Sequence, residues 1–398
     1  MTINHGRRRF LRSGVALPVA GSLSVARFGT ATAAFAAAPA TDPYRKLLVL
    51  VELKGGNDGL NTVVPYTDPT YYALRPKLAI APDQVVQLSD RVGLHPALKP
   101  LSTFWHEHEL AVLQGVGYPA PNLSHFRSIE IWDTASPSDV YLQDGWLTRT
   151  FTRNPVDAKY AADGVVVGSN DLGPLSGNGA RTIALGNTQT FLRRARLAQP
   201  AAAASNPALA HILKVEADIV QARGHLVADR AFETEFPSTA FGNAIKAACQ
   251  VIANPSGVAA VRLTLTGFDT HTNQTATQAR LLDELATGLT ALRSALGELG
   301  RWSDTLVLTY AEFGRRPKEN LSQGTDHGTA NVHFALGGRV VGGLYGEGPN
   351  LAELGNDGNP RHALDFREVY ATVLERWWNI DSRGALGGRF TPVPFVRA

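Results

Sequence analysis

The sequence predicts an α/β protein built on a mainly parallel central sheet. Short, almost continuously apolar runs of strand length recur along the chain, and stretches with apolar residues at helical spacing separate them. Several of these runs end abruptly in glycine, carboxylate and imidazole residues. In open α/β sheets ligands bind outside the carboxyl ends of the strands, so this pattern also predicts a site at one edge of the sheet.

Composition limits the kind of site. The chain has 398 residues, 44% of them hydrophobic and 18% charged, which is typical of a soluble globular protein. Cys249 is the only cysteine, so an intramolecular disulfide and a thiolate metal cluster are both excluded. Metal ligands in this protein must therefore be His, Asp, Glu or hydroxyl groups.

The amino terminus accounts for the positive charge of the chain. Residues 1 to 38 carry five arginines and no acid, so removing their charge from the total of +3 leaves −2. A nucleic-acid-binding surface is therefore not indicated. The run Arg7-Arg8-Arg9-Phe10-Leu11-Arg12, followed by a short apolar segment and an alanine-rich stretch, resembles a twin-arginine export signal. The alternative is a basic disordered arm.

The export reading divides the chain and gives it a location. Residues 1 to 38 are the expected signal peptide and residues 39 to 398 a single domain. The twin-arginine translocase is then a partner during export, and the mature protein is periplasmic or secreted. The apolar segment is too short for a membrane span, which needs about 20 apolar residues, so we expect no transmembrane segment in the mature chain.

The first strand is predicted over residues 46 to 53 and runs into Gly55 and Gly56. Glycine at a strand end allows the backbone to approach a ligand closely. Asp58 follows, placed either to bind a metal ion or to stabilise a turn.

A helix is predicted over about residues 94 to 107 and a second strand over residues 110 to 116. The loop after this strand brings Ser124, His125 and Arg127 together where the next helix begins. Ser124 is placed as a nucleophile or metal ligand, at a helix start whose backbone N–H groups favour an anion. Alternatively, Ser124 or Asn122 only caps that helix.

The next part of the chain contains fewer clear signals. Residues 136 to 200 are rich in Gly, Asn and Pro, and we predict loops, a minor strand pair and a substrate-facing insertion there. A helix is expected over residues 244 to 253. The third strong strand, residues 261 to 266, ends in Asp269 and His271, which are close enough in sequence to reach one ion. A long helix follows over residues 273 to 300.

The last strand-end cluster follows an apolar run over residues 305 to 310. Glu312, Phe313, Gly314 and Arg315 come directly after it, and Asp326 and His327 follow one loop later. The structural alternatives are an ion pair for Glu312 and a turn for the Asp-His-Gly. A strand over residues 334 to 338 and a helix over residues 365 to 378 complete the chain.

These clusters share one edge of the predicted sheet, because the carboxyl ends of parallel strands lie together. A site of carboxylate and imidazole groups without cysteine suits zinc, manganese, magnesium or calcium. The predicted cofactor is therefore a divalent metal, as one or two ions.

The same residues carry a family resemblance. The runs LLVLVELKGGNDGLNTVVPY, NLSHFRS, GFDTH, YAEFGR and GTDHG resemble the exported bacterial family known as domain of unknown function 1501. That family in turn resembles the alkaline phosphatase and sulfatase superfamily. The resemblance implies a three-layer sandwich with helices on both faces of the sheet, and hydrolysis of phosphate or sulfate esters with divalent metals.

The resemblance also implies roles for individual residues. Asp58 matches the first-strand metal carboxylate and Ser124 the nucleophile, whereas Asp269, His271 and His327 match one metal site. Glu312 stands where the superfamily shows an aspartate followed by histidine, but here Phe313 follows. Because Phe313 cannot bind metal, there are two alternatives for the second ion: Asp326 compensates, or the protein binds one ion or none.

Two functions from different classes follow. The first is a hydrolase acting on a small-molecule or polymer ester, in which Ser124 attacks phosphorus or sulfur, Arg127 or Arg315 holds the ester oxygens and His125 assists proton transfer. The second is a catalytically inactive relative that keeps the fold and binds an envelope partner or polymer. The first is favoured by the presence of Ser124, Asp58, Asp269, His271 and His327, and the second by Phe313.

Overall fold

A computed structural model describes residues 42–186 and 230–397. The expected signal peptide, residues 1 to 38, and the last part of the predicted insertion, residues 187 to 200, lie outside the described residues. The described residues form one compact unit. Among the described residues, no helix is both long and apolar enough to cross a membrane.

A nine-stranded sheet forms the centre of this unit, in the order β13-β5-β12-β9-β1-β8-β6-β7 with β14 beside β5. Every pairing in it is parallel except those of β12, which is antiparallel to β5 and β9. The predicted α/β class with a mainly parallel sheet is therefore confirmed. The strands are β1 (Leu47–Lys54), β5 (Leu110–Gly117), β6 (Ala162–Val167), β7 (Thr182–Leu185), β8 (Val258–Thr266), β9 (Thr305–Tyr310), β12 (Asn331–Leu336), β13 (Gly343–Tyr345) and β14 (Leu364–Asp365).

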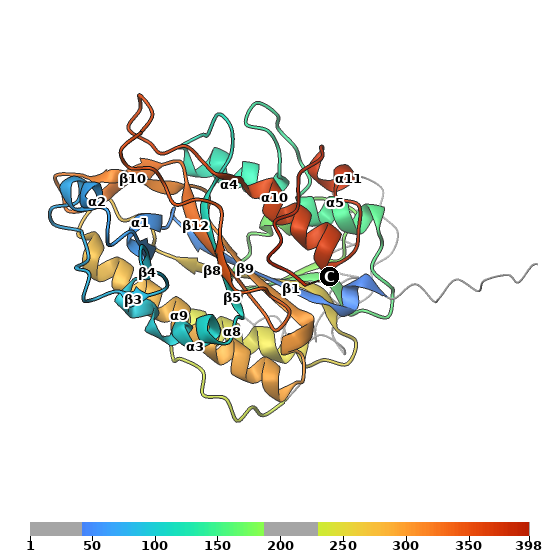
Figure 1. Ribbon diagram of the computed structural model, residues 1–398. Coiled ribbons are helices and arrows are strands. Elements are labelled where there is room, and N and C mark those ends of the chain that lie inside the picture. Colours follow the sequence, from blue (N-terminus) through green and yellow to red (C-terminus); the bar gives the residue numbers. More distant parts are fainter. Residues whose placement is uncertain (1–41, 187–229, 398) are drawn as a thin grey trace, which may run out of the picture. The chain divides into compact units, whose positions relative to one another are not determined.

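Helices cover both faces of the sheet (Figure 1). Successive residues of β1 point to opposite faces, so Val49 and Val51 pack in one core while Leu48 and Leu50 pack in the other. The first core is covered by α3 (Ser102–His106), α8 (Ala240–Ile252) and α9 (Gln274–Glu298). The second is covered by α4 (His125–Thr134), α5 (Trp146–Arg153), α10 (Phe366–Ala371) and α11 (Arg383–Leu386).

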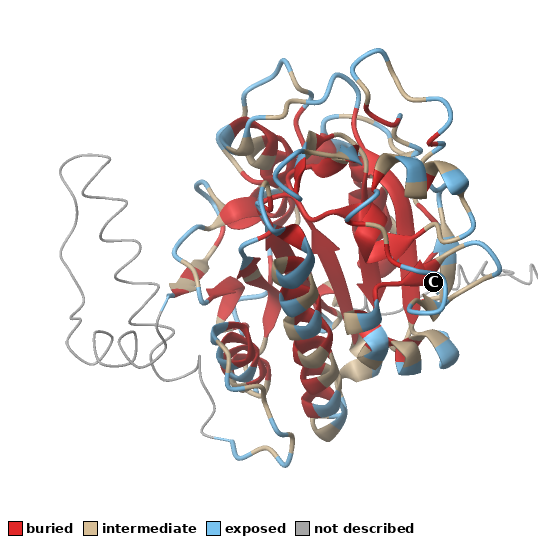
Figure 2. Cartoon of the chain, turned by 90° about the vertical axis from the view of Figure 1, so that its left-hand side faces the viewer, coloured by how far each residue is buried: buried red, intermediate tan, exposed pale blue. Residues whose placement is uncertain are grey.

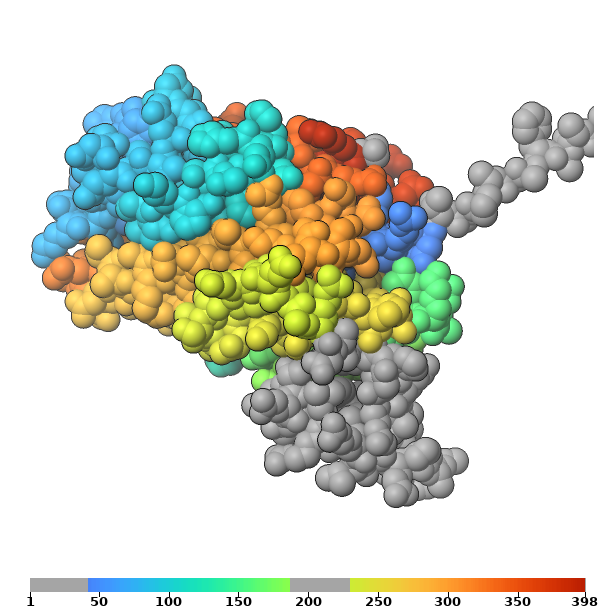
Figure 3. Space-filling view, turned by 90° about the horizontal axis from the view of Figure 1, so that it is seen from below, coloured from blue at the N-terminus to red at the C-terminus, as the bar shows by residue number. Residues whose placement is uncertain are grey.

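The burial pattern follows these three layers. The strands are buried almost throughout, whereas the helices are buried on the side that faces the sheet (Figure 2). Seen from below, α8 in yellow and α9 in gold form one face together with the blue-green segment that contains α3 (Figure 3). The described chain is therefore a three-layer α/β sandwich.

Some elements differ from their predicted form. Residues 94 to 107 contain the end of β4 (Gly93–Leu94), a 3₁₀ helix (Pro96–Leu101) and α3 rather than one helix, because Pro100 interrupts the helical hydrogen bonds. The predicted terminal helix is α10 followed by a π-helical segment, Thr372–Trp377. Within the stretch predicted to be loop-rich, β6 and β7 extend the central sheet, with β6 parallel to β8.

Smaller elements surround the carboxyl ends of the strands. A hairpin of β10 (Gly314–Glu319) and β11 (Thr325–Gly328) follows β9. Next to this hairpin, α1 (Gly59–Thr62) and α2 (Pro69–Leu74) accompany a small sheet of β2 (Val63–Val64), β3 (Val86–Gln87) and β4.

Candidate metal centre

Three histidines and an aspartate meet at the carboxyl ends of the strands. His125 begins α4, Asp269 and His271 follow β8, and His327 lies on β11. The Nε2 atom of His271 is 3.0 Å from Nε2 of His327 and 3.2 Å from Oδ1 of Asp269. His327 Nε2 is 3.4 Å from the same oxygen. These three atoms form a nearly equilateral triangle.

The fourth member, His125, lies on the other side of the aspartate. Its Nε2 is 3.5 Å from Oδ2 of Asp269, and its ring contacts the ring of His327 with centroids 4.4 Å apart. His125, Asp269 and His327 thus also form a set whose donor atoms all lie within 4.8 Å of one another. The described residues therefore offer two overlapping donor sets, of which the triangle with His271 is the tighter.

Each imidazole is held from behind through its Nδ1 atom. His125 Nδ1 lies 2.9 Å from Oε1 of Glu312, His327 Nδ1 lies 2.8 Å from the carbonyl oxygen of Leu123, and His271 Nδ1 lies 3.3 Å from Oδ1 of Asp326. An acceptor at Nδ1 favours the tautomer with the proton there, whose Nε2 lone pair can bind a ligand. Without an ion, the hydrogen bond between the Nε2 atoms of His271 and His327 requires a proton on one of them, which metal binding would release. All three rings are oriented as metal-binding histidines are.

Glu312 and Asp326, which the sequence marks as metal ligands, therefore stand behind the histidines rather than among the inner donors. Glu312 also accepts a hydrogen bond from the backbone N–H of Gly55 at 2.9 Å. Gly55 has a positive φ of 116°, and a Cβ there would lie 2.4 Å from the backbone nitrogen of Asp269. Only glycine allows the end of β1 to approach so closely.

Phe313 forms the floor of the cluster. Its buried ring lies 4.9 Å from the ring of His125 and 4.4 Å from that of His327, measured between centroids. The side chain interpreted as a missing ligand therefore packs under two imidazoles.

Arg315 is directed into the cluster but is fully used. Its buried guanidinium lies 2.6 Å from Oδ1 of Asp269 and donates to the carbonyl oxygens of Gly55, Gly56, Phe268 and Thr325. Burial alone would raise the pKa of Asp269, but the hydrogen bond and charge of Arg315 outweigh it and lower that pKa. Arg315 thus stabilises the carboxylate. Its N–H groups are engaged within the protein, whereas the sequence predicted that they hold ester oxygens.

Arg127 is not at the cluster either. Its guanidinium donates to the carbonyl oxygens of Ser138 and Val140, pairs with Glu130 at 2.9 Å and lies over the ring of Tyr141. The N–H groups of Arg127 therefore serve a neighbouring loop, and its role in holding ester oxygens stays a prediction from the sequence.

Asp58 is the clearest correction among the predicted metal ligands. Its carboxylate is buried, forms an ion pair with Arg75 and accepts a hydrogen bond from Gln274. It also accepts from the backbone N–H of Leu60 at the start of α1. With both oxygens occupied and no solvent access, Asp58 stabilises the fold and is left out of the metal set.

Ser124 keeps its predicted place. It is the exposed residue immediately before α4, and its side chain makes no capping hydrogen bond. Instead, Asn122 accepts from the backbone N–H of Ser124 at 2.9 Å. The hydroxyl of Ser124 is therefore not used as a helix cap, which removes the structural alternative for that side chain.

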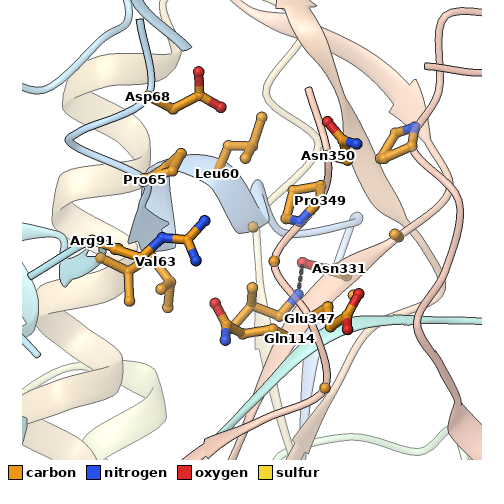
Figure 4. A pocket seen from close by; sticks show the side chains of 18 of the residues that line it. Leu60, Val63, Pro65, Asp68, Arg91, Gln114, Asn331, Glu347, Pro349 and Asn350 are labelled. Carbon is orange, nitrogen blue, oxygen red and sulfur yellow. Dashed lines mark hydrogen bonds between the residues drawn. The ribbon is translucent and has the colours of Figure 1, made fainter. Parts of the chain in front are cut away.

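A separate cavity of about 700 Å³ lies nearby, which the sequence did not predict. Leu60, Val63, Pro65, Asp68 and Arg91 line one side, and Gln114, Asn331, Glu347, Pro349 and Asn350 the other (Figure 4). Arg315 also borders it, but none of the three histidines does. The cavity and the metal centre are therefore different places.

A family model described as "Protein of unknown function (DUF1501)" matches residues 45–385. The chain belongs to the DUF1501 family. A search of curated proteins gave no match.

Among solved structures, this DUF1501 protein is similar to the lipoteichoic acid synthase LtaP from Listeria monocytogenes (11% identity over 76% of this chain and 66% of that chain, TM-score 0.34). It is also similar to a protein in the alkaline phosphatase superfamily from Vibrio parahaemolyticus (12%, 76% and 62%, TM-score 0.37). A third is the PsFucS1 sulfatase from Pseudoalteromonas sp. (10%, 88% and 70%, TM-score 0.37). The chain spans about two thirds of the length of the first two. All three TM-scores are below 0.5, and the function proposed below rests on the site.

Proposed function

We propose that this DUF1501 protein is an exported, metal-dependent hydrolase of phosphate or sulfate esters. The triangle of donor atoms from Asp269, His271 and His327 carries the proposal. Zinc binds nitrogen and oxygen ligands at about 2.0 to 2.2 Å in a tetrahedron, whose edges are then about 3.3 Å long. The observed edges of 3.0, 3.2 and 3.4 Å match one face of such a tetrahedron.

The charges around the triangle also fit a divalent cation. Asp269, Asp326 and Glu312 contribute three negative charges and Arg315 one positive charge. With neutral imidazoles the cluster carries −2, which one divalent ion would neutralise. Asp269, His271 and His327 would hold that ion, which would supply Lewis-acid chemistry by polarising an ester oxygen.

Ser124 is the proposed nucleophile. Its hydroxyl oxygen forms a bond to phosphorus or sulfur while the bond to the leaving alcohol oxygen breaks, and water then cleaves the new serine ester to release phosphate or sulfate. The first backbone N–H groups of α4 lie beside Ser124, and a helix start of this kind stabilises the negative ester oxygens. Those N–H groups take the place of the two arginines expected from the sequence.

His125 is the proposed proton carrier. It follows Ser124 directly, and its hydrogen bond to Glu312 raises its pKa above the usual value. A raised pKa makes the neutral ring a stronger base, so its Nε2 atom can accept the Ser124 proton and then give it to the leaving oxygen. In this assignment His125 is left out of the inner donors, so that one position of the ion stays open for the ester.

One contact favours the alternative, a catalytically inactive protein that binds an envelope partner or polymer. Arg315 lies on the same oxygen of Asp269 that would bind the ion. If that ion pair excludes metal, the cluster is only a polar network. The arrangement of the site favours the hydrolase. Three imidazoles that each have an acceptor at Nδ1 are expected of a metal site, and a polar network without metal does not require them.

A pair of variants tests the function. We expect purified mature protein to contain about one divalent ion per chain by elemental analysis, and to release phosphate or sulfate from simple aryl esters. Ser124→Ala should abolish hydrolysis and keep the metal, whereas His271→Ala should lose the metal. His106→Ala, at an exposed histidine of α3, is the matched control. Wild-type protein that binds no divalent ion and hydrolyses no ester under any metal supplementation would refute the hydrolase and favour the binding protein.

The export proposal rests on the sequence of residues 1 to 38. The paired arginines and the weakly apolar segment after them support delivery to the periplasm or beyond by the twin-arginine translocase. This pathway carries folded proteins, which suits a protein that acquires metal in the cytoplasm.

A further inference from the structure

Exposed apolar side chains gather around the proposed active site. Among the described residues, five large hydrophobic side chains are exposed: Leu321 (101%), Phe126 (89%), Tyr141 (71%), Val140 (40%) and Leu344 (37%). Phe126 follows His125 directly, Leu321 follows Asn320, which hydrogen-bonds to His271, and Val140 and Tyr141 belong to the loop that Arg127 holds. We call Phe126, Tyr141, Val140 and Leu321 the apolar rim.

Phe126 lies on one side of the cluster. It occupies the first turn of α4, directly after Ser124 and His125. Arg127 then extends the rim, because it holds the loop at residues 137 to 141 by hydrogen bonds to Ser138 and Val140. Its guanidinium lies 3.8 Å from the centre of the Tyr141 ring and fixes that ring beside the helix.

Leu321 lies on the other side. It is at the tip of the β10–β11 hairpin, next to Asn320, whose side chain donates to the carbonyl oxygen of His271 at 2.9 Å and lies 3.3 Å from Asp326. The turn with Leu321 is thus connected to His271, which is hydrogen-bonded to His327. The ring of His327 in turn contacts the ring of His125, and Phe126 is the next residue in the chain. The imidazoles lie between two exposed apolar groups.

Folding does not explain this arrangement. Burying a Leu or Phe side chain contributes about 1.5 to 3 kcal/mol, and these two contribute almost nothing because they remain in water. Apolar groups that collect around a site, rather than being scattered, indicate contact with a ligand or partner. Exposed lysines also accompany the Leu321 side: Lys318 is on β10, and the backbone N–H of Lys77 donates to Glu319 of the same hairpin.

We propose that the substrate is an anionic amphiphile, a phosphate or sulfate ester whose alkyl chain rests on one of these two exposed side chains, Phe126 or Leu321, while the ester reaches the metal centre. This inference rests on the proposed hydrolase function and names its substrate class. A protein seated on both side chains would lie across the imidazoles and cover them. An amphiphilic ester uses the same apolar groups and brings the reacting bond to Ser124.

The test compares ester hydrolysis at two chain lengths. Wild-type protein should hydrolyse octyl phosphate or octyl sulfate with a kcat/KM at least tenfold above that for the ethyl ester. The double variant Phe126→Ser/Leu321→Ser should reduce this octyl-to-ethyl ratio at least tenfold. Leu344→Ser, at an exposed leucine on β13 that borders the separate cavity, is the matched control and should keep the wild-type ratio.

A binding measurement separates this inference from the proposed function. Wild-type protein should sediment with phosphatidylcholine vesicles containing phosphatidic acid, and the double variant should not. Equal rates for ethyl and octyl esters would overturn the inference and leave the hydrolase intact. If no ester is hydrolysed, the proposed function fails, but vesicle binding still tests the inference. Binding by wild type that is lost in the double variant supports an amphiphile site, and absence of binding by wild type overturns it.

Discussion

Arg75 and Asp58 form an ion pair that is completely buried, with Arg75 Nη1 2.5 Å from Asp58 Oδ2. Arg75 also donates to Asn61 and to the carbonyl oxygens of Arg316 and Pro317. The pair therefore joins α1 and α2 to the β10 strand that carries Arg315. Its role is to hold these segments together beneath the metal centre.

Removing one partner of this pair should destabilise the protein without affecting its metal. Asp58→Ala leaves the Arg75 charge buried and unpaired, which typically costs about 3 to 5 kcal/mol. We expect that loss in the free energy of unfolding, measured with denaturant, together with an unchanged metal content. Asp83→Ala, at an exposed carboxylate, should change stability by less than about 0.5 kcal/mol. Loss of the ion from folded Asp58→Ala protein would instead restore Asp58 as a ligand.

Glu312 should act through His125 rather than through the ion. Its Oε1 atom holds His125 Nδ1 and the backbone of Gly55, whereas its buried Oε2 atom has no hydrogen-bond partner in the described structure. Glu312→Gln removes the charge that favours protonated His125. Partners of this kind typically contribute 10- to 100-fold, so we expect kcat to fall about that much with metal content unchanged. Glu347→Gln, at an exposed carboxylate, should have wild-type activity, and an equal rate for Glu312→Gln would exclude His125 as the proton carrier.

Export is testable in cells without any enzyme assay. Lysine has the same charge as arginine but lacks the planar guanidinium. Replacing both arginines by lysine therefore tests whether the translocase recognises the guanidinium groups rather than the charge alone. Arg7→Lys/Arg8→Lys should leave unprocessed precursor in the cytoplasm, as followed by fractionation and blotting. Lysine at Arg27, which lies outside the paired motif, should not affect export. Periplasmic delivery of the double variant at the wild-type level would contradict the export proposal.

The sequence predicted the sheet well because its strands are buried on both faces. The apolar runs of β1, β5, β8 and β9 are readable without any knowledge of their neighbours. The sequence predicted β6 and β7 only as a minor strand pair, because they are short and lie among glycine-rich turns. Their membership in the sheet depends on pairing between β6 and β8, about a hundred residues apart, and such pairing leaves no local signal.

The sequence predicted which residues of the candidate site lie at strand ends, but not which side chains they contact. The sequence places Asp269, His271 and His327 where buried strands or loops end, and the structure brings them together. For Asp58 the same reasoning failed, because the sequence does not show that Arg75 reaches its carboxylate. Phe313 was interpreted only as an absent ligand. Phe313 packs beneath His125 and His327 because segments that follow different strands meet there, and the sequence does not show that they meet.

His333 gives the protein a built-in sensitivity to acid. It lies on β12 with both ring nitrogens buried and without a hydrogen-bond partner in the described structure, against the ring of Trp132. Burial lowers its pKa to about 3, whereas an unfolded chain has a histidine pKa of about 6.5. Between these two values the unfolded state binds one more proton than the folded state. The free energy of unfolding therefore falls as the pH drops below about 6.5, and His333 contributes its full stability only above that pH.

Replacing this residue should flatten the acid side of the stability profile. Each pKa unit corresponds to 1.36 kcal/mol, so at pH 4.5 protonation in the unfolded state removes about 3 kcal/mol that His333→Leu would not lose. Denaturant unfolding at pH 7.5, 5.5 and 4.5 measures the two slopes. His95, whose pKa burial lowers to about 4, contributes equally to both proteins and cancels in the comparison. His106→Leu, at an exposed histidine, should follow the wild-type slope. Parallel profiles for wild type and His333→Leu would mean that the buried ring accepts a proton in the folded state, and the neutral assignment of His333 would then be wrong.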